Sequence, residues 1–220
     1  MIQPDKIIRS DRKTLSVCVD PFGRVTVRAP KRCDTARIFA FLEEKENWIL
    51  RQKAKTAGAG MRLPPENLDG FSFLLLGKNC KISLVSGTRI SYDAERGILF
   101  LPEKNARERL VKWLKENAKR ILSALTEEKA REMGTAYKSV SATSAKTRWG
   151  SCSGKGRLHF SYRLIYAPEE IVDYVVVHEL AHIPHKNHGS QFWAFTKSVC
   201  PDYVKKRKWL KENAFLMDIF

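Results

Sequence analysis

The alternation of apolar and polar residues near the start of the chain predicts a β-hairpin. Residues 15–19 alternate, Asp20-Pro21-Phe22-Gly23 supply a turn, and residues 25–27 resume the alternation. From Asp34, a residue type suited to an N-cap, the apolar spacing becomes helical and predicts a helix that reaches about Thr56. The stretch 58–70 is rich in Gly and Pro, which favours a connecting loop.

Further short apolar runs predict strands, followed by a long helix. The strands are expected near residues 71–76, 81–85, 89–92 and 98–101. Asn105 and Glu108 have the spacing of a capping box, and the apolar stripe that follows predicts a helix ending near Gly134. We place a domain boundary just before this helix, which gives a β-rich N-terminal domain, residues 1–104, and a second domain, residues 105–220.

The second domain combines a few short strands with three closing helices. Extended segments are expected at residues 139–143, 147–149 and 157–161, with glycine breaks such as Gly150, and helices at about 168–183, 190–200 and 202–214. The predicted fold class is therefore α+β: a β-rich N-terminal half with a helix, then a half in which a small sheet packs on helices. The N-terminal half is expected either to recognise substrate or only to shield one side of a cleft.

Composition and charge narrow the class of protein. The 220 residues are 43% hydrophobic, which is ordinary for a globular protein, and no apolar run is long enough for a signal peptide or a membrane span. We expect a cytoplasmic protein without membrane association. The net charge of +16 is spread over both halves and favours anionic partners such as nucleic acid, nucleotides or acidic proteins, with solubility alone as the alternative. The five scattered cysteines form no C-x-x-C pair, which argues against a disulfide framework and a thiolate zinc cluster.

Four of the five histidines lie within eleven positions, in the segment VVVHELAHIPHKNHGSQFW. His178 and His182 extend an apolar helical stripe, and two imidazoles four residues apart on a helix can bind one ion. Glu179 is rotated by about 100° around the helix axis from His178. It is therefore poorly placed to be a metal ligand but close enough to contact a water molecule bound to the metal. These residues form an H-E-x-x-H motif, in which the carboxylate is suited to act as a general base.

Pro184 should end this helix within a residue or two of His182, and the chain must then turn. The five residues 183–187 are enough to reverse direction and bring His188 to the same ion, which makes His188 the third expected ligand. His185 lies at the centre of the turn and is interpreted as a surface or structural histidine, with a transition-state hydrogen-bond donor or a further ligand as alternatives. His159, on a predicted strand, is interpreted as structural. For the whole cluster, the alternative is a set of packed histidines without a ligand, which would be costly.

With these residues in view, the chain resembles the YgjP-like metallopeptidase family, a neighbour of the WLM and SprT-type zinc peptidases. The resemblance is carried by TRWGSCS at 147–153, LIYAPEEIVDYVVVHELAH at 164–182 and NHGSQFW at 187–193. Ser161 departs from it, since such sequences commonly have Asn there. The resemblance implies a zincin-like second domain and one zinc ion per chain on His178, His182 and His188, with another divalent metal as the alternative.

The resemblance also implies that Glu179 is the general base and that the segment around Arg148 lies beside the cleft. Arg148 could stabilise an oxyanion or hold a phosphate, or form only a structural ion pair. The leading expectation is a zinc-dependent hydrolase of metallopeptidase type that cleaves an amide in a peptide or protein substrate. The alternatives are a metal-dependent nucleoside triphosphate pyrophosphatase and a nucleic-acid-associated protein of SprT or WLM type, the second supported by charge alone.

Overall fold

The hairpin expected near the N-terminus is present and belongs to a three-stranded sheet. The structure is a computed structural model that describes residues 2–20, 22–57 and 64–218. Strands β2 (Ser16–Val19) and β3 (Val25–Pro30) pair antiparallel, as predicted. An additional strand, β1 (Lys6–Ser10), pairs parallel to the other edge of β3, so that the strand order is β1-β3-β2.

Two helices, rather than the single helix predicted, cover one face of this sheet. Helix α1 (Thr35–Glu44) ends at Lys45, and α2 (Glu46–Ala57) follows at once. Asp34 occupies the N-cap position of α1 without a side-chain capping hydrogen bond. The helices and β3 share a core in which all six residues are fully buried: Val25, Val27, Ala29, Ile38, Leu42 and Ile49.

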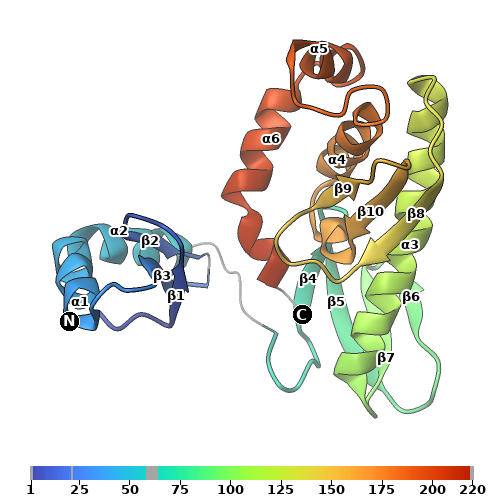
Figure 1. The fold of residues 1–220 in the computed structure, drawn as a ribbon. Helices are drawn as coiled ribbons and strands as arrows, with labels where there is room; N and C mark the ends of the chain where they lie inside the picture. Colours follow the sequence, from blue (N-terminus) through green and yellow to red (C-terminus); the bar gives the residue numbers. More distant parts are fainter. Residues whose placement is uncertain (1, 21, 58–63, 219–220) are drawn as a thin grey trace. The chain divides into compact units, whose positions relative to one another are not determined.

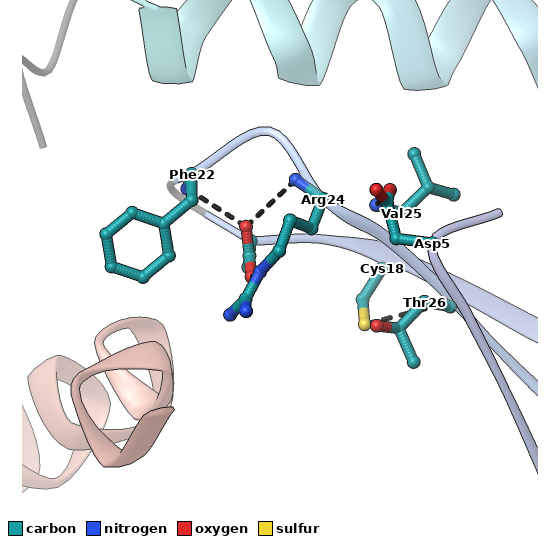
Figure 2. A network of polar contacts seen from close by, with 7 residues as sticks. Asp5, Cys18, Phe22, Arg24, Val25 and Thr26 are labelled. Carbon is teal, nitrogen blue, oxygen red and sulfur yellow. Dashed lines mark hydrogen bonds and ion pairs between the residues drawn. The ribbon is translucent and has the colours of Figure 1, made fainter. Parts of the chain in front are cut away.

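The turn between β2 and β3 is held by one carboxylate. The backbone N–H groups of Phe22 and Arg24 donate to Asp20 Oδ1 at 2.9 and 3.0 Å, and Arg24 Nε lies 2.6 Å from Asp20 Oδ2 (Figure 2). Asp5 links the start of the chain to β3, because its carboxylate accepts a hydrogen bond from the N–H of Val25 at 2.6 Å (Figure 2). An Asp side chain that accepts N–H groups in this way replaces the backbone acceptors that a tight turn lacks.

The remaining strands and helices form a larger assembly with two further sheets (Figure 1). The first sheet has the order β4-β5-β7-β6, with β5 parallel to β7, and the second has the order β8-β10-β9, with β8 parallel to β10. The strands are β4 (Ser72–Leu75), β5 (Lys78–Val85), β6 (Ser91–Asp93), β7 (Ile98–Pro102), β8 (Ser139–Thr143), β9 (Gly150–Cys152) and β10 (Arg157–Ser161).

Helices connect and cover these sheets. They are α3 (Ala106–Glu132), the 3-10 helix η1 (Tyr162–Tyr166), α4 (Glu169–Ala181), α5 (Ser190–Val199), α6 (Tyr203–Glu212) and the 3-10 helix η2 (Ala214–Asp218). Helix α4 lies at the centre, because it contacts α3, α5, α6 and β9 and buries nine of its thirteen residues. A helix that is apolar nearly all round belongs in a core, and α4 therefore provides a rigid support for any residue at its end.

Most predicted elements of this part are present, with local differences at Gly150 and at Asn105. Gly150 was expected to break a strand but begins β9, which lies slightly later than the predicted extended segment 147–149. Asn105 has a left-handed backbone, φ 57° and ψ 36°, and its side chain makes no capping hydrogen bond, so the predicted capping box does not form. Among the described residues, no helix is both long and apolar enough to cross a membrane.

The contacts divide the chain into two compact units, residues 1–63 and 64–220, which does not coincide with the boundary predicted before Asn105. Strands β4 and β5 belong with the second unit because their turn docks on η1 and the start of α4. The N–H of Leu76 donates to the carbonyl oxygen of Ile165 at 2.7 Å, and Phe73 packs edge-on against Tyr166. Residues 58–63 of the predicted connecting loop lie outside the described residues.

Candidate active site

The last turn of α4 positions His178 and His182, and the chain then reverses to return His188. The N–H groups of Ile183 and His185 donate to the carbonyl oxygens of Leu180 and Ala181, at 2.9 and 3.1 Å, and continue the winding of the chain for a few residues past α4. Pro184 has no N–H with which to extend the helix. The end predicted from the sequence is confirmed, since α4 stops at Ala181 with His182 as its C-cap.

The three histidines form a group that can hold one metal ion. One ring nitrogen from each of His178, His182 and His188 lies within 4.8 Å of the others, and the Nε2 atoms of His178 and His188 are 3.1 Å apart. Two nitrogens at 2.0–2.1 Å from a tetrahedral zinc ion would be roughly 3.3 Å apart. A hydrogen bond between two rings would also explain the 3.1 Å distance, but it would not account for the third ring beside them. The residues therefore fit a metal ion.

The surroundings of His178 and His188 favour the neutral imidazole, which is the form that binds a metal. Burial, and then the neighbouring His182 and His188, lower the pKa of His178 to about 3. The pKa of His188 is also lowered, by burial and by His182 and Arg207. His182 Nδ1 lies 3.2 Å from the carbonyl oxygen of His185, so the tautomer that donates from Nδ1 leaves Nε2 bare for the ion.

Aromatic rings of α5 fix the orientation of the histidines. Phe192 is fully buried, and its ring centre lies 5.0, 4.6 and 4.7 Å from those of His178, His182 and His188. Trp193 stacks on His188, with ring centres 5.5 Å apart and planes 27° apart. Through these contacts, Phe192 and Trp193 pack α5 against the turn that carries His188. His188 itself is exposed, so the group is open to solvent on that side.

Glu179 lies beside this group, under strand β9. Its side chain is 6% exposed, and burial raises its pKa to about 7, against the opposing positive charge of Arg148. The contact with the strand is close: a Cβ added to Gly150 would lie 2.6 Å from Glu179 Oε1 and 2.7 Å from its Cγ. Only a glycine at position 150 lets β9 approach the carboxylate this closely, and no pattern in the sequence indicates that contact.

Arg148 precedes β9 and is exposed. Among the described residues its guanidinium group makes no hydrogen bond or ion pair, so the structural ion pair considered from the sequence is not observed. Its charge acts on Glu179, whose pKa it lowers, and its side chain lines a cavity of about 280 Å³ on the second sheet. Arg148 is therefore near the carboxylate, without an observed contact to the three histidines in the described part of the chain.

The other two histidines lie outside the group, as predicted. The ring of His185 packs edge-on against Phe195, with centres 5.6 Å apart, and its backbone carbonyl faces His182. His159 lies on β10, where Nδ1 is 2.6 Å from the hydroxyl oxygen of Ser141. Both positions agree with a structural interpretation.

One cation near the site was missed. Arg207 on α6 lowers the pKa of His178 and His188, and its guanidinium carbon lies 5.1 Å from the ring centre of Trp193. Arg207 belongs to the basic run Lys205-Lys206-Arg207-Lys208, which in the sequence alone has the pattern of a solvated helix face. Periodicity identifies the exposed side of a helix, but it does not show which neighbouring element lies beside that side.

The fold and this site define an α+β protein with a three-histidine group able to hold a metal ion at the end of a buried helix. Residues 13–213 match the sequence model of the YgjP-like metallopeptidase domain, and the chain therefore belongs to that family. The family identifies the protein as a metallopeptidase. A comparison with curated proteins found no match.

Two solved structures share a weaker similarity. One is the metallopeptidase zymogen abylysin of Pyrococcus abyssi, with 22% identity, a TM-score of 0.38, and coverage of 41% of this chain and 93% of that chain. The other is the metallopeptidase zymogen jannalysin of Methanocaldococcus jannaschii, with 17% identity, a TM-score of 0.38, and coverage of 41% and 94%.

Proposed function

We propose that the protein is a zinc-dependent peptidase in which His178, His182 and His188 hold the metal and Glu179 is the general base. The convergence of the three ring nitrogens within 4.8 Å carries this proposal. An all-imidazole donor set suits zinc better than magnesium or calcium, which prefer oxygen ligands. A thiolate ligand is not favoured, because within the described part of the chain the group of candidate ligands contains three histidines and no cysteine.

A zinc ion held in this way would act as a Lewis acid, which acidifies water and polarises the carbonyl group to be attacked. Glu179 then accepts a proton from the attacking water at its carboxylate and can deliver it to the leaving amine. Burial raises the pKa of Glu179 toward neutrality, and a carboxylate in that range can both accept and release a proton. Arg148 stabilises the ionised carboxylate and is a candidate to bind negative charge that develops on the substrate.

Strand β9 offers a docking edge for a peptide. It pairs with β10 on one side, and no other strand of the described residues pairs with its free edge. An extended peptide can add to such an edge through backbone hydrogen bonds. Since Gly150 of β9 contacts Glu179, a peptide along this edge would lie beside the general base. This arrangement supports a peptide substrate over a nucleotide.

The test compares the zinc-loaded wild-type chain with the Glu179→Gln variant against a broad peptide library and the four ribonucleoside triphosphates. We expect peptide cleavage by the wild type and a loss of at least about 100-fold in the variant, which retains its metal. Pyrophosphate release without peptide cleavage would instead support the alternative of a nucleoside triphosphate pyrophosphatase. Cleavage that is unaffected by Glu179→Gln would exclude the proposed general base. Steeply salt-dependent DNA binding would support the nucleic-acid-associated alternative.

A further inference from the structure

The two faces of the second three-stranded sheet differ in chemistry. Gly150 faces Glu179 of α4, and its cross-strand partner Phe160 is fully buried on the same side. Side chains alternate along a strand, so Ser151 and its partner His159 lie on the opposite, outer face. The outer face is polar, and the loop between β8 and β9 crosses over part of it, where Ser161 Oγ donates to the carbonyl oxygen of Ala145 at 2.7 Å.

A cavity of about 280 Å³ lies between this loop and the outer face, and we call it the outer pocket. It is lined by Thr143, Ala145, Arg148, Ser151, His159 and Ser161. None of these residues is acidic. The volume lies at the lower limit of ordinary ligand sites, which suits one side chain better than a nucleoside triphosphate.

Some polar side chains of the outer pocket already form hydrogen bonds within the protein, and others could bind a ligand. The hydroxyl of Ser161 donates to the carbonyl oxygen of Ala145, and that of Thr143 donates to the carbonyl oxygen of Phe160 at 3.2 Å. The guanidinium of Arg148 and the hydroxyl of Ser151 make no hydrogen bond with the described residues. His159 uses Nδ1 with the hydroxyl of Ser141, which leaves Nε2 available. Together, the guanidinium group of Arg148, the hydroxyl of Ser151 and Nε2 of His159 are complementary to a carboxylate, which accepts hydrogen bonds and carries a negative charge.

The outer pocket is also within reach of a peptide on β9. A peptide added to the free edge of β9 would place every second side chain on the outer face, with Cβ atoms about 5 Å from that of Ser151. Arg148 connects this position to the candidate active site, because its side chain lines the pocket and it lies two residues before Gly150, which packs against Glu179.

We propose that the outer pocket binds the carboxylate of an aspartate or glutamate side chain in a peptide that lies along β9. The inference deepens the proposed peptidase function and rests on it for the position of the peptide. It makes Arg148 and Ser151 determinants of a preference for acidic residues near the cleavage site. A chain of net charge +16 also attracts acidic peptides in general, so the experiment includes a control variant that removes a different arginine.

The experiment measures binding rather than cleavage, in the full-length, zinc-loaded Glu179→Gln protein. Two fluorescent peptides are compared, Thr-Val-Glu-Val-Thr and the same sequence with Gln at the centre, both with blocked ends. We expect the Glu peptide to bind roughly 10- to 100-fold more tightly, as for a hydrogen-bonded charged group. Arg148→Met and Ser151→Ala should each reduce this ratio, and Arg148→Met should bring it close to one.

The matched control is Arg89→Met, which removes an exposed arginine that precedes β6 of the other sheet. This variant should retain the Glu preference. Equal binding of the two peptides, a ratio unchanged by Arg148→Met, or an equal loss in Arg89→Met would each overturn the proposal. It would also be overturned if ATP competed for Arg148 and bound more tightly than the Glu peptide, because the pocket would then recognise phosphate.

The outcomes separate this inference from the proposed function. If the wild-type protein cleaves no peptide but the Glu peptide binds in an Arg148-dependent way, the peptidase proposal fails and the proposal for the outer pocket stands. If peptides are cleaved with no difference between Glu and Gln in binding, the peptidase proposal stands and the proposal for the outer pocket fails.

Discussion

The close contact between Gly150 and Glu179 predicts that one added methyl group will disturb the general base. In Gly150→Ala the new Cβ would lie 2.6 Å from Oε1, 2.7 Å from Cγ and 2.9 Å from Cδ of Glu179, whereas ordinary contact begins at 3.4 Å. Part of the glutamate or of β9 must therefore move by roughly 1 Å. The neighbouring residues of α4, Leu180 and Ala181, are fully buried, so the helix backbone cannot easily yield.

A misplacement of about 1 Å at a catalytic group can cost about 100-fold in rate. We therefore expect Gly150→Ala to lower kcat/KM for peptide hydrolysis by about that factor. It should also cost about 1–3 kcal/mol of stability through overpacking. Its metal content should be unchanged, because the three histidines are not touched. The backbone at Gly150 does not have a positive φ, so alanine can adopt its conformation without backbone strain. The expected effect therefore comes from the clash of the added Cβ with Glu179.

The assay pairs peptide hydrolysis with metal analysis and thermal unfolding. Gly154→Ala is the matched control, since a Cβ at Gly154 meets nothing within 4 Å. It should behave like the wild type. Full activity in Gly150→Ala, or an equal loss of activity in Gly154→Ala, would refute the reasoning.

Three further predictions concern metal binding and stability. His188→Ala should lose the metal on dialysis because only two imidazoles remain, whereas His185→Ala should keep it, since His185 is outside the group; equal metal contents would contradict the assignment. Phe192→Ala should lower the free energy of unfolding by about 3–5 kcal/mol in denaturant titrations, because the buried ring supports all three histidines; a change below about 1 kcal/mol would be inconsistent with that packing. Asp20→Ala should destabilise the first unit by about 1–2 kcal/mol without changing the metal content, because the turn loses its acceptor; hydrogen exchange of the hairpin amides measures this, and unchanged protection would argue against it.

The parts of the site that follow from local geometry could be predicted from the sequence. The spacing of His178 and His182 fixes their shared helix face, and Pro184 fixes where the helix ends, so the return of His188 required only a short turn. The group of three histidines confirms this reasoning. Each step depended on residues within ten positions of one another.

Contacts between distant segments could not be predicted in the same way. The approach of Gly150 to Glu179, and the electrostatic effect of Arg207 on the histidines, join residues of separate elements with no pattern linking them in the sequence. Strand β1 was missed for a related reason: within the described residues β3 is its one pairing partner, and its burial does not alternate clearly between the faces. The break at Lys45 was missed because the apolar stripe continues through it, and periodicity does not register a short interruption.

The division of the chain by its contacts also depends on segments that are distant in the sequence. The sequence suggested a division where short strands give way to a long helix, before Asn105. The structure joins β4 and β5 to η1 and α4 through the hydrogen bond from Leu76 to Ile165 and the contact of Phe73 with Tyr166. A change of secondary structure along the chain is therefore a weaker guide to a boundary than the contacts that cross it.

The most direct test of the account is X-ray absorption spectroscopy of the zinc-loaded wild-type protein, with one equivalent of metal per chain. The proposed site predicts three imidazole nitrogens and one oxygen ligand, all at about 2.0–2.1 Å from the metal. A sulfur ligand at about 2.3 Å, or a protein that binds no metal while its three histidines remain intact, would contradict it.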